Sequence, residues 1–351
     1  MKILYAVQAT GNGHISRAME LIPYLQRYGI IDVFLSGDNS NLSFDLPVKY
    51  RSKGLSLYSN SRGGLDYWKI ARSCNPFRVH NEINDLPVEN YDLVINDFEY
   101  ITAAACRRKG KHSFHLGHQA SFQSSLTPRP DHKNVMGEWI LKNYAKATNY
   151  IGLHFEQYDD FIFPPVIKSE ILEAEPVDKG YITVYLPSYS LNLLEQTIKT
   201  YKDVQFQVFS KEVKQPAHKG RIMFFPVNQM LFNKSLIECH GLITGAGFET
   251  PAESLFLGKK ILAVPTRGQY EQSCNAAALE RMGVMCLNTI DRHFSLVFDQ
   301  WMNSKKPVKI NYNQAIPRIL DYMFTLHAAH ENDHYSVTRE MMNDDNPALS
   351  F

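Results

Sequence analysis

Residues 1–18 read MKILYAVQATGNGHISRA, and this stretch decides the fold of the first half of the chain. The apolar run at residues 1–8 predicts a buried strand, the glycines at positions 11 and 13 predict a tight turn, and a helical pattern begins near Ser16. A strand, a glycine-rich turn and a helix form the first unit of a parallel α/β sheet. Such a turn exposes backbone N–H groups at a helix N-terminus, where an anion or a polar sugar can bind.

His14 lies directly after the second glycine of this turn. An imidazole in this position can act as a general base near neutral pH. The alternative is a turn histidine that caps the helix or meets solvent, and the turn alone does not decide between the two. The pattern G-x-G-x-x-S lacks the third glycine of a dinucleotide-binding turn, so it is weak evidence for a nicotinamide dehydrogenase.

Asp97 closes another strand, YDLVIND at residues 91–97. Parallel strands end at the same edge of a sheet, so we expect Asp97 near the turn that carries His14. A carboxylate in that place can orient an imidazole and stabilise its protonated form. The alternative is an N-cap for the helix that starts near Glu99, and one aspartate can serve both roles.

The alternation of strands and helices runs along the whole chain and is interrupted once. Residues 158–180 contain Pro164, Pro165 and Pro176, which is typical of a connector between domains. We therefore predict an α/β fold of two Rossmann-like, doubly wound domains that face a cleft. The predicted boundaries are 1–163 for the first domain, 164–180 for the linker, 181–330 for the second domain and 331–351 for a loosely held polar tail.

Composition excludes several classes of protein. The 37 Lys and Arg against 36 Asp and Glu give a net charge of +1, so the chain is not built to coat nucleic acid. The 5 cysteines form no C-x-x-C pair, which argues against a zinc site or a disulfide framework and indicates a reducing compartment. No apolar run approaches the roughly 18 residues of a membrane span, and residues 1–8 favour a strand over a signal peptide. We expect a cytoplasmic protein.

The second domain contains the most informative stretch, GLITGAGFETPAESLFLGKKILAVPTRGQYEQSCNAAALERMG at residues 241–283. A strand ends in Gly245-Ala246-Gly247, and a helix begins near Thr250, an arrangement that suits a diphosphate. Glu253 falls one turn into that helix and can accept hydrogen bonds from a ribose diol. The alternative is a capping box in which Glu253 reaches back to Thr250. Glu271 and Gln272 follow the next strand, either in a cleft-facing loop or in an ordinary solvated turn.

This order of residues resembles the donor-binding signature of the GT-B glycosyltransferases, which include UDP-glycosyltransferases and the N-acetylglucosaminyltransferase of the peptidoglycan lipid intermediate. The similarity is strongest to bacterial glycosyltransferases described at family level. It covers both domains, because GNGHISRA at residues 11–18 resembles the N-terminal glycine-rich loop of these enzymes. Two departures are visible: Gly245-Ala246-Gly247 stands where many relatives have His-Gly-Gly, and Glu271 stands where aspartate is usual.

The resemblance implies an inverting transfer of sugar from a UDP-sugar to an acceptor hydroxyl, in the synthesis of a cell-envelope glycan or glycolipid. It implies no cofactor besides the nucleotide-sugar co-substrate and no metal, since no acidic cluster with ligand spacing accompanies the second glycine loop. His14 would be the base, with Asp97 behind it. The residues implied in donor binding are Gly13, Phe224 on the base, Gly245, Ala246, Gly247 and Thr250 on the diphosphate, Glu253 on the ribose, and Glu271 and Gln272 on the sugar.

Two weaker signals concern the acceptor. His118 and Gln119 end a first-domain strand and can line the acceptor side, although a histidine satisfied within its loop is the favoured interpretation. Residues 67–80, YWKIARSCNPFRVH, mix aromatic and basic side chains. They favour an amphipathic helix packed on the domain over contact with an anionic membrane surface.

Two other functions fit the same architecture. A nucleotide-sugar epimerase would act on the donor alone, without an acceptor. A non-catalytic nucleotide-sugar-binding protein would bind the donor without turnover.

Overall fold

The computed structural model describes residues 1–9, 12–37, 48–54, 75–305 and 309–344. Gly11 of the first turn and residues 67–74 of the aromatic and basic stretch lie outside these ranges. No helix of the described residues is long and apolar enough to cross a membrane.

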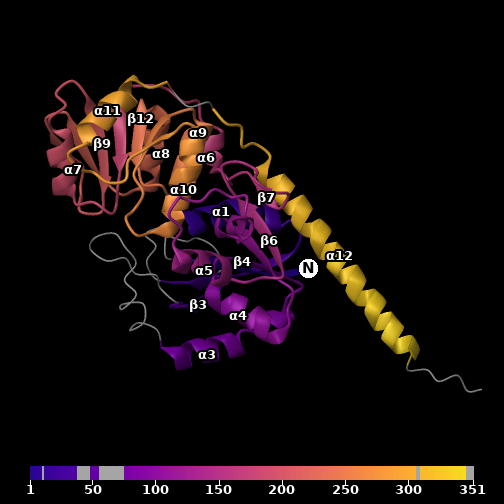
Figure 1. Ribbon diagram of the computed structural model, residues 1–351. Helices are drawn as coiled ribbons and strands as arrows, with labels where there is room; N and C mark the ends of the chain where they lie inside the picture. Colours follow the sequence, from indigo (N-terminus) through magenta and orange to yellow (C-terminus); the bar gives the residue numbers. More distant parts are fainter. Residues whose placement is uncertain (10–11, 38–47, 55–74, 306–308, 345–351) are drawn as a thin grey trace, which may run out of the picture.

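The first half of the chain forms a seven-stranded, entirely parallel sheet (Figure 1). Its strand order is β3-β2-β1-β4-β5-β6-β7, so the chain starts in the middle and winds outward in both directions. The strands are β1 (Lys2–Gln8), β2 (Ile30–Ser36), β3 (Val48–Ser52), β4 (Leu93–Asp97), β5 (Phe114–Gly117), β6 (Asn149–Leu153) and β7 (Ile162–Phe163). The helices are α1 (Asn12–Leu25), α3 (Pro76–Asp85), α4 (Tyr100–Lys109) and α5 (Val135–Asn143), with 3-10 turns η1 (Val88–Asn90) and η2 (Gln119–Gln123).

The second half repeats the design with a sheet of order β10-β11-β9-β8-β12-β13-β14, parallel except for the β10 and β11 pair. Its strands are β8 (Tyr181–Tyr185), β9 (Gln205–Ser210), β10 (Ala217–Lys219), β11 (Ile222–Pro226), β12 (Gly241–Thr244), β13 (Lys260–Ala263) and β14 (Met285–Cys286). Its helices are α7 (Leu191–Ile198), α8 (Gln229–Glu238), α9 (Glu249–Phe256), α10 (Tyr270–Arg281) and α11 (Phe294–Asn303). The two sheets are joined by residues 164–180, which contain the short helix α6 (Ser169–Leu172).

The centre of each sheet is a switch point, where successive connections leave in opposite directions. In the first sheet it lies between β1 and β4, and in the second between β8 and β12. Ligands of open α/β sheets bind beyond the carboxyl ends of the strands at such points. The structure therefore singles out the segments that follow β1, β4, β8 and β12.

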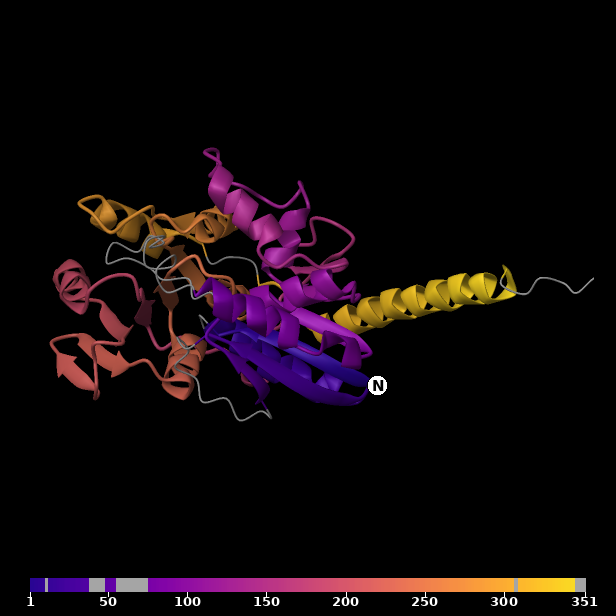
Figure 2. The same cartoon turned by 90° about the horizontal axis from the view of Figure 1, so that it is seen from below.

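Helix α12 (Ala315–Asp344) differs from the expected C-terminal tail, because it continues without a break through residues 331–344. Its first turns are anchored by Ile316, Ile319, Leu320 and Met323, which are buried and recur at helical spacing. Extending a nucleated helix costs far less than starting one, so the anchored turns can support the polar continuation. In both views the far part of α12 projects beyond the two sheets (Figures 1 and 2).

A second difference concerns α1, which begins at Asn12 and not near Ser16. Gly13 and His14 therefore belong to the first turn of the helix, not to the loop before it. This places the His14 side chain on a helix that is fixed to β1, a more rigid position than a loop.

Candidate functional site

The first switch point brings together the two residues that the sequence predicts as a base and its partner. His14 comes from α1, directly after β1, and Asp97 is the last residue of β4. Nδ1 of His14 lies 2.8 Å from Oδ1 of Asp97. Asp97 is fully buried, whereas the His14 side chain is 15% exposed, so the imidazole is the part of the pair that solvent reaches.

Arg17 completes this group, although no motif in the sequence predicts its role. Its Nε donates to Oδ2 of Asp97 at 2.9 Å and its Nη2 donates to Oδ1 at 2.8 Å, which is a two-pronged ion pair. Burial alone would raise the pKa of the Asp97 carboxyl, but the charges of Arg17 and His14 outweigh it and hold that pKa well below its ordinary value. Asp97 is therefore a carboxylate at any working pH. The available signal was spacing, since positions 14 and 17 share one face of a helix.

Arg17 also connects the two halves of the chain. Its Nη1 donates to Oε1 of Glu249 at 2.5 Å, and Glu249 is the first residue of α9 in the second half. Burial would lower the pKa of Arg17, but the carboxylates of Asp97 and Glu249 raise it above its ordinary value. The guanidinium is thus a permanent charge between the domains.

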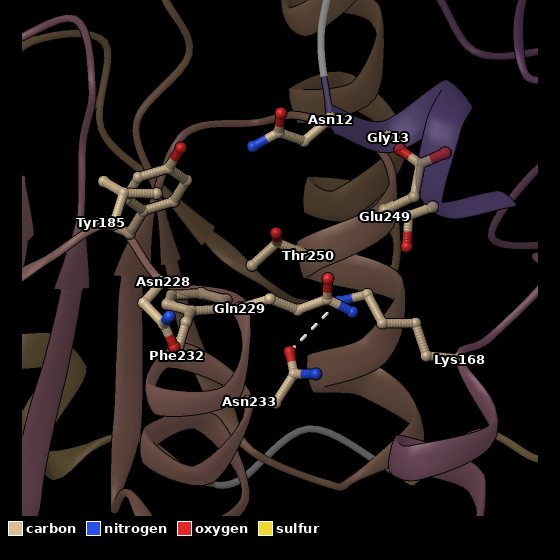
Figure 3. Close-up of a pocket in the computed structure, with 12 residues that line it drawn as sticks. Asn12, Gly13, Lys168, Tyr185, Asn228, Gln229, Phe232, Asn233, Glu249 and Thr250 are labelled. Carbon is tan, nitrogen blue, oxygen red and sulfur yellow. Dashed lines mark hydrogen bonds between the residues drawn. The ribbon is translucent and has the colours of Figure 1, made fainter. Parts of the chain in front are cut away.

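Next to this group a cavity of about 300 Å³ opens between the two halves of the chain (Figure 3). It lies at the second switch point, because Tyr185 at the end of β8 and Thr250 near the start of α9 both line it. Neutral polar groups, an aromatic pair, one lysine and one glutamate surround it. The lining residues are Asn12, Gly13, Ser16, Lys168, Tyr185, Val227, Asn228, Gln229, Phe232, Asn233, Glu249 and Thr250.

The predicted phosphate loop precedes α9. A Cβ on Gly245 would lie 3.4 Å from Oε1 of Gln272, so this loop and the predicted sugar-binding glutamine are neighbours. The carbonyl of Ala246 accepts a hydrogen bond from Nδ2 of Asn275 at 3.0 Å. A Cβ on Gly247 would meet nothing within 4 Å, which leaves open space beside its backbone. Of the predicted donor-binding residues, Gly13 and Thr250 line the cavity itself.

Glu253 lies one turn further along α9 and is not among the residues that line the cavity. Its side chain is 2% exposed and forms an ion pair with Lys168 of the linker, with 2.9 Å between Oε1 and Nζ. Burial raises the pKa of Glu253, and the charge of Lys168 opposes that rise. The structure gives no contact between Glu253 and Thr250 that would match a capping box, so its partner is the linker lysine.

Phe224 also lies away from the cavity. It is 5% exposed and packs in the core of the second domain with Val208 and Ile243. A side chain in this position is not available to stack on a ligand in the cavity. Tyr185 and Phe232 provide the aromatic surface there, with ring centroids 5.3 Å apart. Tyr185 ends β8 and Phe232 lies on α8, so both are outside the stretch around Phe224 that the sequence singles out for the base.

His118 and Gln119 lie in the contact between the domains. His118 is 1% exposed, and its two ring nitrogens are paired with the carbonyl of Leu153 at 2.9 Å and with Oδ1 of Asn275 at 2.7 Å. Both partner atoms are oxygens that accept hydrogen bonds; burial lowers the pKa of His118, while the Glu271 carboxylate and these two hydrogen bonds oppose that shift. This is the favoured interpretation of a satisfied histidine, with the addition that its partner belongs to the other domain.

Glu271 and Gln272 begin α10 at the same interface. Oε1 of Glu271 accepts from Nε2 of Gln119 at 3.1 Å. Gln272 accepts from the backbone N–H of Thr266 at 2.8 Å and donates to Oε1 of Gln269 at 2.9 Å. Among the described residues, no group of three or more His, Cys, Asp and Glu side chains is placed to hold a metal ion.

Comparison with known proteins agrees with this architecture. The family model described as glycosyl transferase family 1 matches residues 1–295. No curated protein matches the chain.

Solved structures are similar along most of the chain. Arabidopsis thaliana UGT89C1 complexed with quercetin has a TM-score of 0.62 at 12% identity, over 93% of this chain and 99% of that one. Phytolacca americana UGT2 complexed with UDP-2-fluoro-glucose and pterostilbene has a TM-score of 0.58 at 12% identity, over 93% of each chain. SnogD, a glycosyltransferase from Streptomyces nogalater, has a TM-score of 0.50 at 13% identity, over 82% of this chain and 86% of that one. At these identities the similarity shows the fold, and the predicted GT-B architecture is confirmed.

Proposed function

Because the chain belongs to glycosyl transferase family 1, whose model matches residues 1–295, we propose that it moves a sugar from a UDP-sugar to an acceptor hydroxyl with inversion at the anomeric carbon. The observation that carries this proposal is the pair of His14 and Asp97, 2.8 Å apart, beside a cavity at the second switch point. One switch point holds a base and the other holds space for a donor.

In the proposed reaction the acceptor O–H lies against Nε2 of His14. Nδ1 donates to Asp97, which holds the ring in place and leaves Nε2 as the nitrogen that takes the acceptor proton. The acceptor oxygen then bonds to the anomeric carbon on one face while the bond to the diphosphate breaks on the other, and this inverts the centre. The leaving diphosphate gains negative charge, which the N-terminus of α9 and the open backbone at Gly247 stabilise.

For the donor we propose the 300 Å³ cavity, a volume at the lower end of small-molecule sites. Tyr185 and Phe232 supply a surface for the base, and Asn228 and Gln229 supply amide groups for its polar edge. The diphosphate would meet Gly245, Ala246, Gly247 and Thr250. UDP is bound in other solved structures of this fold, one of UGT89C1 and one of LpCGTa.

The sugar would extend from the diphosphate toward Glu271 and Gln272, of which Gln272 borders Gly245. A ribose contact by Glu253 requires its carboxylate to turn from Lys168 toward the ligand. Lys168 itself lines the cavity, so it can follow the nucleotide when that exchange occurs. We propose that no metal takes part, and that His118 and Gln119 support the acceptor side from the domain contact.

For the acceptor we propose a cell-envelope glycan or glycolipid, used by a cytoplasmic enzyme at the inner face of the membrane. Support comes from α5, where Val135, Met136 and Trp139 are 85%, 56% and 64% exposed on one helix. Lys142 lies one turn after Trp139 and is partly exposed. Apolar and basic side chains together suit an interface with anionic lipid.

The test combines binding and turnover. A set of nucleotide sugars is screened by thermal shift, and those that stabilise the protein are incubated with glycan and glycolipid acceptors and followed by mass spectrometry. Transfer that depends on an acceptor supports the proposal. An isomerised donor without acceptor indicates an epimerase, and binding without any product indicates a binding protein.

A further inference from the structure

Three polar atoms at the first switch point lie within one hydrogen-bond length of each other. Nδ1 of His14 is 2.8 Å from Oδ1 of Asp97 and 3.0 Å from Nη2 of Arg17, and that Nη2 is 2.8 Å from the same Oδ1. A ring nitrogen has one position in the ring plane, which holds either a hydrogen or a lone pair. Nδ1 can therefore donate to Asp97 or accept from Arg17, but not both at once.

The two partners select opposite tautomers of His14. When Nδ1 donates to Asp97, Nε2 carries a lone pair and can take a proton from an acceptor. When Nδ1 accepts from Arg17, the ring proton is on Nε2, which then cannot act as a base. The tautomer of a catalytic histidine depends on the partner of its other nitrogen.

Glu249 holds Arg17 in this place from the other domain. Its Oε1 is 2.5 Å from Nη1 of Arg17, and a Cβ on Gly13 would lie 2.6 Å from its Oε2. The carboxylate therefore sits beside the first turn of α1 and at the start of α9, and it lines the cavity. Helix N-termini attract anions, so a bound diphosphate and the Glu249 carboxylate would compete for this region.

We propose that Arg17 is a positioning residue that couples the donor site to His14. In the donor-free protein Glu249 holds the guanidinium against Nδ1, and the ring proton is on Nε2. A diphosphate at the start of α9 displaces the Glu249 carboxylate by like-charge repulsion and draws the guanidinium off Nδ1, which then donates to Asp97. The proton on Nε2 passes to water and another reaches Nδ1 from water, because the His14 side chain is 15% exposed.

This inference rests on the proposed function, which supplies the diphosphate. Its consequence is an order of events: the base becomes active after the donor is in place. An acceptor that arrives first meets a protonated Nε2, and its hydroxyl is not activated.

The tautomer can be read from the imidazole 15N chemical shifts of the full-length, 15N-labelled protein. The His14 signals are assigned by their loss in His14→Gln. Without ligand we expect the proton on Nε2, and with saturating UDP we expect it on Nδ1. Glu249→Gln removes the charge that holds Arg17, so the Nδ1-protonated fraction should rise without UDP. Glu138→Gln is the matched control, since its carboxylate is about as exposed as that of Glu249 and pairs with Arg129 and not with Arg17.

Binding of UDP is measured separately by calorimetry, so that the two proposals can fail independently. UDP that binds without changing the tautomer overturns the coupling and leaves the donor site standing. Absence of UDP binding contradicts the proposed donor, while the Glu249→Gln spectrum still decides whether that residue controls His14. A ligand-free protein that already carries the proton on Nδ1, in both parent and Glu249→Gln, overturns the inference.

Discussion

The two switch points occupy the same place in two similar sheets, yet one is filled with charge and the other is open. At the first, His14, Arg17 and Asp97 contact each other within 3.0 Å, and Asp97 is fully buried. At the second, neutral amides, hydroxyls and two aromatic rings line a cavity together with Glu249, and its lysine is paired with Glu253. A fixed charge network suits a reaction that needs exact placement of a base, and an open, mostly neutral space suits a ligand that brings its own charge.

Removing the base at the first switch point should have the largest effect. His14→Ala should lower the turnover number by about 10²–10⁴-fold, the usual contribution of a positioned general base. The dissociation constant for UDP should barely change, because most of the cavity belongs to the second domain. Steady-state kinetics and calorimetry on the same preparation check both parts.

Asp97→Asn is the companion variant and should cost less turnover than His14→Ala, since the imidazole remains while its orienting charge is lost. The assignment of the base to the first switch point and of the donor to the second would be wrong if His14→Ala abolished UDP binding and Asp97→Asn left the kinetics unchanged. In that case the first switch point would be a phosphate site, and the base would lie elsewhere.

At the second switch point the next largest effect should be on stability. Lys168→Met leaves the buried Glu253 carboxylate without its ion-pair partner, which costs about 3–5 kcal/mol of unfolding free energy. Glu253→Gln should cost less, because Lys168 is 15% exposed and can be solvated. Urea unfolding of both variants measures this asymmetry.

Lys219→Met is the control for that pair, since Lys219 is 69% exposed where it meets Glu195. A surface ion pair of this kind contributes about 0–1 kcal/mol. Equal losses for Lys168→Met and Lys219→Met would show that the buried pair is not structural. Glu253 would then be free to serve the ribose without a stability cost.

A smaller effect should come from His115, on β5 near the first switch point. It is 1% exposed, neither ring nitrogen has a hydrogen-bond partner among the described residues, and burial lowers its pKa to about 4. Its folded pKa is below the unfolded value of about 6.5, so its contribution to stability is complete above that pH and is lost as the pH falls toward 4. At pH 5 the loss should be about 2 kcal/mol.

The check is urea unfolding at pH 7 and pH 5 for the parent and for His115→Phe, which keeps the ring shape and cannot titrate. The difference between the two pH values should shrink by about 2 kcal/mol in the variant. His293→Phe is the control, because that side chain is 59% exposed. An unchanged pH dependence in His115→Phe would mean that the ring has the same pKa in the folded and the unfolded protein, which contradicts a lowering by burial.

The ends of strands could be predicted from the sequence, and with them the approach of His14 to Asp97. Short continuous apolar runs locate the buried strands and their ends, and parallel topology brings those ends to one edge. The directions of side chains could not be predicted in the same way. Glu249 and Glu253 lie one turn apart on α9, but Glu249 lines the cavity while Glu253 is buried against a linker residue. The buried environment of Glu253 depends on Lys168, which is 85 residues away in the sequence, so no local sequence pattern predicts it.

The smallest expected effect is that of a chelator, and it tests the charge contrast most directly. Most of the lining of the second switch point is neutral, and the proposed stabilisation of the leaving diphosphate comes from the N-terminus of α9 and the backbone at Gly247. Excess EDTA should therefore leave the turnover number unchanged.

The Glu249 carboxylate makes metal-free binding the stricter expectation. A carboxylate in the cavity repels the phosphates unless it moves or a cation screens its charge. Loss of activity in EDTA that magnesium restores would assign that screening to a metal and would contradict the displacement of Glu249 by the diphosphate. Two results together would show that the Glu249 carboxylate moves away from the diphosphate. The enzyme would keep full activity in EDTA, and Glu249→Gln would bind UDP more tightly than the parent.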